Sequence, residues 1–184
     1  MAMNRFKVAK YASLEMNFAE YLATGNIVSQ IPLGEEFTEN APCENGMWVC
    51  ADRSKGKIAS IADVDEPIGI VYTTEKEYDS EHYGLKTFGR KIAGDYPRVG
   101  IFSIGDTVTT NCLQYDDSEY TSEENLFTAL AKFETTPVYV VPVVGSPVPK
   151  LTATKPASGT YAKVCKLYTV PNGERAVKYQ IVNL

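Results

Sequence analysis

Residues 98–113 read RVGIFSIGDTVTTNCL, and this stretch carries the strongest structural signal in the chain. Apolar residues alternate with other residues in its first half, at Val99 and Ile101, and with threonines in its second half, around Val108. Such alternation is typical of strands with one buried face, and β-branched residues favour a pleated surface. The two halves meet at Gly105-Asp106. We therefore predict a β-hairpin that turns at Gly105-Asp106, to which the other strands are added.

The chain as a whole has the composition of a globular protein. It has 184 residues, of which 44% are hydrophobic and 22% charged, which argues against a disordered or fibrous chain. This length fits one well-buried domain with an insertion, or at most two small domains. The net charge is −5 and the basic residues are dispersed, so we expect no nucleic acid partner. No stretch approaches the roughly 18–20 apolar residues of a membrane span, and no apolar leader follows the first residues. We therefore expect a protein made in the cytoplasm, with no membrane association.

Short apolar runs separated by Gly, Pro and Asn recur about every ten residues between residues 27 and 71. This rhythm is typical of a small β-barrel or β-sandwich, so we predict a mainly β fold with one or two short helices. Trp48, the single tryptophan, lies in one of these runs, and we predict that it packs in the core; an exposed binding anchor is the alternative. The expected strands are Ile27-Val28, Met47 to Ala51, Lys57 to Ile61 and Glu66 to Val71.

Residues 1–26 are expected to form an N-terminal arm, and residues 27–184 the β domain. Leu14, Phe18 and Leu22 recur every four residues, which predicts a helix from near Ser13 that ends at Gly25. Such a helix either packs on its own domain or docks on a neighbouring subunit.

Residues 72–97 interrupt the strand rhythm with an acidic, Tyr-rich half followed by a basic half. A stretch of this length indicates an inserted loop or long hairpin. It is either a solvated loop or a protein interface, since aromatic residues among both signs of charge favour contact surfaces. Together with the arm, it supplies the candidate partner-binding residues, which are Phe6, Tyr11, Phe18, Tyr78, Tyr83, Phe88 and Tyr96.

The clearest helix signal covers residues 121–133. Thr121 and Glu124 fit a capping box, and an apolar face follows. That face consists of Leu126, Phe127, Leu130 and Phe133.

Two further segments predict strands near the C-terminus. Five prolines punctuate β-branched runs in residues 137–156, which predicts an edge strand, because proline cannot donate to an inner ladder. The tetrapeptide Pro171 to Glu174 predicts a hairpin with Asn172-Gly173 as its two turn residues. In that register Tyr168 would face Val177, and the hairpin would form the C-terminal edge of the domain.

Catalytic motifs are not evident in the sequence. His82 is the only histidine, and it lies in an exposed-looking context. Ser103 lies between Gly100 and Gly105, but with one residue too many before it for a nucleophile elbow, so we interpret it as a strand residue. No phosphate-binding or metalloprotease motif is present. We therefore predict no catalytic residues and no enzyme activity.

The cysteines and carboxylates also favour structural roles. The cysteines, at positions 43, 50, 112 and 165, lack metal-ligand spacing, so we expect buried thiols, with a Cys43–Cys50 disulfide as the alternative. Two acidic runs, Asp63-Asp65-Glu66 and Asp116-Asp117-Glu119, are interpreted as solvated turns. Calcium binding there, or a glycosidase carboxylate pair, remains an alternative, although neither run has the EF-hand spacing. No cofactor and no metal are expected.

Two segments of the chain resemble a known class of viral proteins. The segment GMWVCADRSKGKIASIADVDEPIGIVY, followed by RVGIFSIGDTVTTNCL, is similar to capsid decoration (cement) and related head-associated proteins of tailed bacteriophages. The shared pattern is a "G...ad..G.i......piGi" strand before "v...G..v..n". The matching residues are Gly46, Ala51, Asp52, Gly56, Ile58, Pro67, Ile68, Gly69, Ile70, Gly105, Asp106, Val108 and Asn111.

The resemblance implies a non-enzymatic virion protein on the outside of the phage head. Such a protein binds the lattice of the major capsid protein and stabilises the head, and it is repeated over that lattice as a homo-oligomer. The insertion at 72–97 and the helix at 121–133 depart from the minimal pattern, so a head-tail connector, tail or baseplate protein is an alternative. A carbohydrate- or host-surface-binding β module, with a concave site lined by tyrosines and Trp48, is another.

Overall fold

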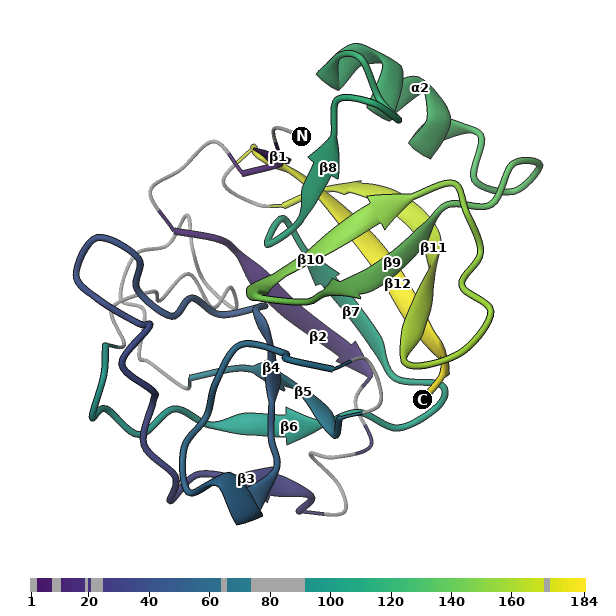
Figure 1. Cartoon of the computed structure of the whole chain (residues 1–184). Helices are drawn as coiled ribbons and strands as arrows, with labels where there is room; N and C mark the ends of the chain where they lie inside the picture. Colours follow the sequence, from purple (N-terminus) through teal and green to yellow (C-terminus); the bar gives the residue numbers. More distant parts are fainter. Residues whose placement is uncertain are drawn as a thin grey trace.

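The computed structural model describes residues 3–7, 11–18, 20, 25–63, 66–73, 92–170 and 173–184. These residues form two β-sheets, and neither closes into a barrel (Figure 1). The predicted mainly β class is confirmed, and the arrangement is that of a β-sandwich. Within the described residues, no helix is long and apolar enough to cross a membrane.

The larger sheet has eight strands in the order β1-β8-β10-β9-β11-β12-β7-β2. Its pairs are antiparallel except for β10 and β8, which run parallel at Lys150 and Gln114. The strands are β1 (Met3–Arg5), β2 (Leu14–Phe18), β7 (Thr107–Thr110), β8 (Gln114–Asp116), β9 (Tyr139–Val143), β10 (Ser146–Thr152), β11 (Tyr161–Thr169) and β12 (Arg175–Asn183).

The smaller sheet has four antiparallel strands in the order β3-β6-β5-β4. They are β3 (Ile27–Val28), β4 (Trp48–Cys50), β5 (Ile68–Val71) and β6 (Val99–Ile101). Strands were predicted at all four places. The run from Lys57 to Ile61 makes only isolated bridges, at Ile58 and Ala59, and a short 3₁₀ helix, η1 (Arg53–Lys55), precedes it.

Trp48 joins the cores of the two sheets. Its side chain on β4 is fully buried, and its ring meets Phe102 edge-on at a centroid distance of 5.0 Å. Its indole Nε1 donates a 3.0 Å hydrogen bond to the hydroxyl of Tyr179 on β12. The predicted core position of Trp48 is confirmed, and a concave site lined by Trp48 is excluded.

The stretch 98–113 forms two strands but not a hairpin, so this prediction was wrong. β6 pairs with β3 and β5 in the smaller sheet, whereas β7 pairs with β12 and β2 in the larger one. The connection between them is fixed on β12, because Gly105 N–H donates to Ile181 O and Ile181 N–H donates to Asp106 O. Ser103 lies in this connection and not in a strand.

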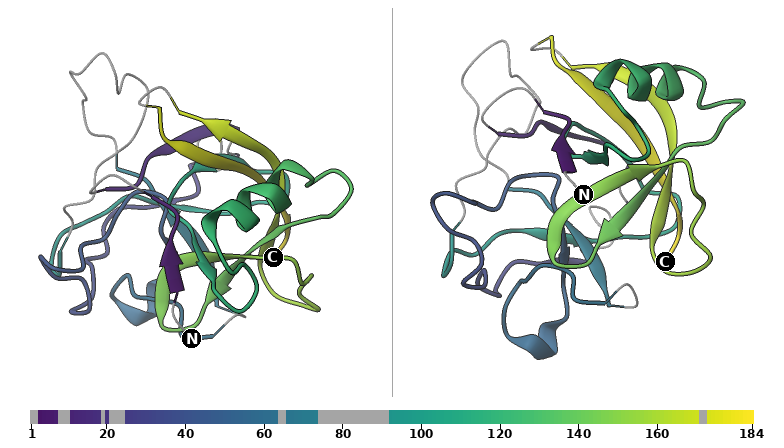
Figure 2. Two further views of the ribbon diagram at one scale, coloured as in Figure 1. Left: turned by 90° about the horizontal axis from the view of Figure 1, so that it is seen from above. Right: turned by 45° about the horizontal axis from the view of Figure 1, so that its top comes forward.

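The described part of the N-terminal segment belongs to the larger sheet. Residues 14–18, predicted as helix, form strand β2, which pairs with β7. The sequence LEMNF alternates with period two as well as period four, and the partner strand decides between the two patterns. β1 pairs with β8, and only residues 111–113 separate β7 from β8 (Figure 2). Both edge strands of the larger sheet therefore come from residues 3–18.

The predicted helix is α2 (Glu123–Ala131), which lies against β11 (Figure 2). Its N-cap is Ser122 and not Thr121, because the Ser122 backbone is extended and its hydroxyl accepts a hydrogen bond from Asn125 N–H. The predicted apolar face is confirmed. Leu126 and Leu130 are fully buried, and the partly buried Phe127 and Phe133 pack against the same core.

The proline-rich segment lies inside the sheet and not at its edge. It forms the β9–β10 hairpin, which is flanked by β11 and β8. Pro147 and Pro149 fall in a register irregularity between Ser146 and Lys150, where the ladder is already interrupted. An inner strand tolerates prolines at such a bulge.

The C-terminal hairpin exists, but its predicted register and edge position were wrong. β11 and β12 lie between β9 and β7, and Tyr168 pairs with Ala176 instead of Val177. The hairpin closes between Val170 and Glu174, so three residues connect the strands and not two. Gly173 has a φ of +83°, as the turn prediction requires.

All four cysteines are free thiols, so the alternative Cys43–Cys50 disulfide is not formed. Cys43, Cys50 and Cys112 are buried as expected, whereas Cys165 is partly exposed. Most of the predicted insertion, residues 74–91, lies outside the described residues.

Candidate functional site

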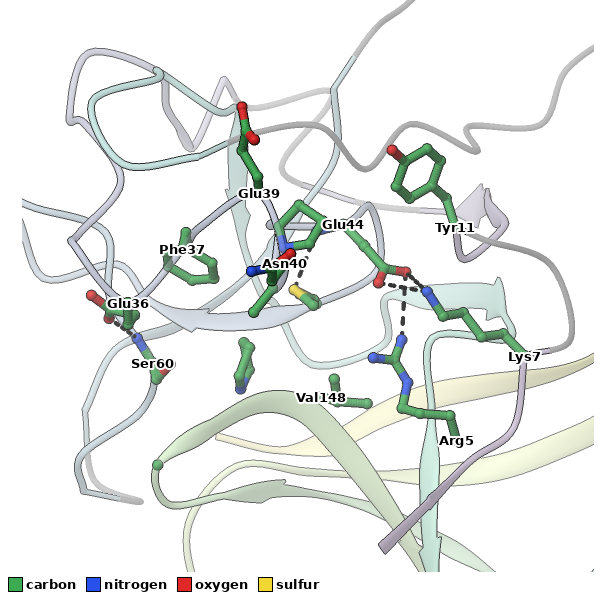
Figure 3. A pocket seen from close by; sticks show the side chains of 15 residues that line it. Arg5, Lys7, Tyr11, Glu36, Phe37, Glu39, Asn40, Glu44, Ser60 and Val148 are labelled. Atoms are coloured by element: carbon green, nitrogen blue, oxygen red, sulfur yellow. Dashed lines mark hydrogen bonds and ion pairs between the residues drawn. The ribbon is translucent and has the colours of Figure 1, made fainter.

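A groove of about 630 Å³ lies between the N-terminal segment, the loop that ends at Met47 and the β9–β10 hairpin (Figure 3). We call it the N-terminal groove. Arg5, Lys7 and Glu44 form its polar wall, and Val148 contributes an apolar surface. The groove therefore joins charged and apolar surface in one cavity, as binding sites for small molecules and peptides do.

Glu44 is the centre of the polar wall. Its carboxylate is buried, and Lys7 Nζ lies 2.5 Å from both of its oxygens. Oε2 also accepts a 2.8 Å hydrogen bond from Ala12 N–H and a longer one, 3.4 Å, from Arg5 Nη2. Buried carboxylates need such partners, because an uncompensated charge in the interior is costly. Glu44 thus fastens the N-terminal segment to the loop at residues 42–47.

Both cations of the N-terminal segment reach the groove from the end of β1. Arg5 is the last residue of this strand and Lys7 follows a bend at Phe6, and both cationic side chains contact Glu44. Phe6 is buried, and its ring meets Phe127 of α2 edge-on at 5.4 Å. One short segment therefore contributes to the core and to the charged wall.

Cys112 lies behind the polar wall, with its Sγ 4.0 Å from Arg5 Nη2. Its side chain is fully buried, and this burial raises the pKa of the thiol to about 12. The thiol is therefore protonated at neutral pH. It neither balances the charge of Arg5 nor provides a reactive thiolate.

Polar side chains at the two ends of β7 also hold the N-terminal segment. At one end, Asp106 accepts hydrogen bonds from Glu20 N–H and from Ser103 N–H. At the other end, Asn111 Oδ1 accepts from Ser13 N–H at 2.6 Å, while its Nδ2 donates to Glu174 at 2.7 Å. These side chains satisfy backbone donors where regular strand pairing stops.

The predicted partner-binding residues do not form one cluster among the described residues. Phe6 is buried in the core of its own chain, Tyr11 lines the N-terminal groove, and Tyr96 is 60% exposed outside that groove. The side chain of Phe18 lies outside the described part, and so do Tyr78, Tyr83 and Phe88.

The acidic runs form turns and ion pairs in the part of the chain that the structure describes. Asp116 accepts hydrogen bonds from the backbone and hydroxyl of Ser118, which lower its pKa. Glu66 pairs with Lys55, and this contact lowers the pKa of Glu66. No group of three or more His, Cys, Asp or Glu residues is placed to hold a metal ion there. His82 and Asp65 lie outside this part.

Arg5, Lys7 and Glu44 were not predicted from the sequence as site residues. The alternation of charged and aromatic residues in MNRFK could have indicated that Arg5 and Lys7 share one side. Glu44 gave no local signal, because it lies 37 residues from Lys7 and meets it only in the folded chain.

Comparisons of the chain with family models, with curated proteins and with solved structures found no match.

Proposed function

We propose that this protein is a non-enzymatic virion structural protein that binds the lattice of the major capsid protein and stabilises a phage head. The proposal starts from the pattern shared with decoration proteins in residues 46–70 and 105–111. In the fold, these residues form β4, β5, β7 and the connections beside them.

The observation that best supports the proposal is the way residues 3–18 complete the β domain. They supply both edge strands of the larger sheet, β1 with three residues and β2 with five. A long, unpaired edge on a protein held at high density would pair with its neighbours, and very short edge strands reduce that risk. A protein repeated over a capsid lattice needs this protection.

The polar side chains around the N-terminal segment hold it on the β domain, which supports the same proposal. Glu44, Asp106 and Asn111 all accept hydrogen bonds from backbone N–H groups of residues 12–20. They hold the segment on the domain, so the molecule presents a defined surface to its partner. On a lattice each contact with the partner can be weak, because multivalent placement raises the effective concentration.

The proposal is tested by sedimentation with phage heads. The purified full-length protein is mixed with mature heads that lack it, and the copies bound per head are measured by gel densitometry. We expect saturable binding at hundreds of copies. A copy number of about a dozen would instead assign a connector or tail position, since such a ring carries few subunits.

Absence of binding to heads and tails would contradict any virion role. A glycan screen by thermal shift then tests the carbohydrate-binding alternative, because a ligand that binds only the folded state raises the melting temperature.

A further inference from the structure

The polar wall of the N-terminal groove contains two cations and one carboxylate. Lys7 Nζ and Ala12 N–H make the close contacts with Glu44, at 2.5 Å and 2.8 Å. Arg5 is left with one 3.4 Å contact to an oxygen that already has two closer donors. The guanidinium of Arg5 is therefore poorly compensated by its own chain.

A second observation also shows that the guanidinium of Arg5 lacks hydrogen-bond acceptors. Arg5 Nε is buried and has no hydrogen-bond partner among the residues that the structure describes. A second neighbour of the guanidinium, Cys112 Sγ, is 4.0 Å away and belongs to a neutral thiol, which is a weak acceptor. A buried guanidinium donor without an acceptor costs free energy, so the charge of Arg5 is only partly compensated within the chain. The Arg5 side chain nevertheless remains 32% exposed, so a ligand in the groove can reach it.

The chemistry of the groove limits what that ligand can be. A guanidinium binds a carboxylate through two parallel hydrogen bonds. Glu36 and Glu39 lie on the side of the groove away from Arg5, so a polyanion such as nucleic acid would be repelled (Figure 3). Met47 and Val148 line the groove as apolar surface. A single carboxylate flanked by apolar side chains fits this combination.

We propose that the N-terminal groove binds an extended segment of a partner protein that carries an acidic side chain between apolar residues, with Arg5 as the anchor for the carboxylate. The identity of this partner as the capsid lattice rests on the function proposed above. The carboxylate site itself rests only on the groove.

The site is tested by NMR on the full-length, ¹⁵N-labelled protein with two peptides, Ac-Val-Glu-Val-NH₂ and Ac-Val-Gln-Val-NH₂. The Nε–H resonance of Arg5 reports on a change of environment at the guanidinium, of which Nε is part. We expect the Glu peptide to shift this resonance and the backbone amide of Val148, and the Gln peptide to bind at least about tenfold more weakly, since one charge-assisted pair is worth about that factor. Equal binding of both peptides, or no shift with either, would overturn the proposal.

Two variants separate the site from general electrostatics. Arg5→Gln should abolish the preference for the Glu peptide, whereas Lys163→Gln, which removes a charge from the exposed side of β11, should keep it. If Arg5→Gln lowers the melting temperature, Arg5→Lys is used in its place. This variant keeps the positive charge but loses the two parallel hydrogen bonds of the guanidinium. A preference as large as that of the wild type in either Arg5 variant would contradict the proposal.

Sedimentation with phage heads then tests the partner. Arg5→Gln should lower head binding at least about tenfold while Lys163→Gln binds like the wild type. If the peptide result holds and head binding is unchanged, the carboxylate site stands and its assignment to the capsid is wrong. If no variant or wild-type protein binds heads, the proposed function fails independently of the groove.

Discussion

The indole Nε1 of Trp48 donates a 3.0 Å hydrogen bond to the hydroxyl of Tyr179, and this bond connects the smaller sheet to the larger one inside the core. Both side chains are fully buried, and their rings meet edge-on at a centroid distance of 5.9 Å. Because a buried N–H must find an acceptor, the pair fixes how the two sheets face each other.

Tyr179→Phe should lower the free energy of unfolding by about 1–3 kcal/mol. The substitution keeps the ring but leaves the indole N–H of Trp48 buried without an acceptor. Urea denaturation followed by the fluorescence of Trp48, the single tryptophan, measures the change directly. An unchanged midpoint would show that the hydrogen bond does not contribute to stability.

Tyr120→Phe should have the opposite outcome and provides the matched control. The hydroxyl of Tyr120 is buried and has no hydrogen-bond partner within the described part of the chain, so its removal takes away an unsatisfied polar group. We expect no loss of stability, or a gain of up to about 1 kcal/mol. A loss as large as that of Tyr179→Phe would mean that both effects arise from packing and not from hydrogen bonding.

The stability of the protein should fall in alkaline solution, in part through Cys112. Burial raises the pKa of this thiol from 9.0 to about 12 in the folded state. Above pH 9 the unfolded chain therefore releases a proton that the folded chain keeps. The contribution of the thiol is fully present below pH 9 and is lost as the pH rises toward the folded pKa, at up to about 1.4 kcal/mol per pH unit.

Cys112→Ala isolates this contribution. The variant should be less stable than the wild type at pH 7, because it leaves a small cavity. The difference should shrink by about 1 kcal/mol or more between pH 9 and pH 10.5, since only the wild type loses the thiol contribution. Buried tyrosines titrate in both proteins, so their effects cancel. Parallel stability curves over this range would contradict the assigned pKa shift.

Local signals in the sequence were sufficient to predict α2 and the position of Trp48. The helix carries its own capping residues and an apolar face with period 3.6, and both signals lie within thirteen residues, 121–133. A tryptophan in an alternating run is expected in the core because its side chain is large and mostly apolar, and this expectation does not depend on which strand pairs with the run. Even so, the N-cap lies one residue later than predicted, because both threonine and serine, here Thr121 and Ser122, can cap a helix.

Pairing between strands could not be predicted, because it depends on residues far apart in the chain. The alternation in 98–113 correctly indicates two strands, yet nothing local shows that β6 joins one sheet and β7 the other. The C-terminal hairpin was placed at an edge for the same reason. The N-terminal groove is the extreme case, since Arg5 and Glu44 are 39 residues apart in the chain and meet only in the folded structure.

Glu44→Gln should release the N-terminal segment. The substitution removes the negative charge that lies 2.5 Å from Lys7 Nζ, whose side chain is only 12% exposed, and it weakens the acceptor of Ala12 N–H. Breaking a buried ion pair by removing one partner costs about 3–5 kcal/mol. Hydrogen exchange should accelerate at the amides of Ala12 and Phe6, which bond to Glu44 and Leu113.

Glu39→Gln is the matched control for the Glu44 variant. Glu39 lines the same groove but is exposed, so the free energy of unfolding should change by less than about 0.5 kcal/mol. Equal effects of the two variants would show that the net charge of the groove, and not the buried pair, holds the segment.

Gly173→Val should destabilise the C-terminal hairpin by about 1 kcal/mol or more, because Gly173 has a φ of +83° and β-branched residues disfavour this region. A Cβ at this position would meet no atom within 4 Å, so the cost comes from the backbone and not from a clash. Gly173→Asn should therefore cost less, since asparagine adopts the left-handed region more readily. Urea denaturation of both variants measures the difference. Equal losses would mean that side-chain bulk decides at Gly173, and two unchanged midpoints would mean that the turn relaxes to negative φ.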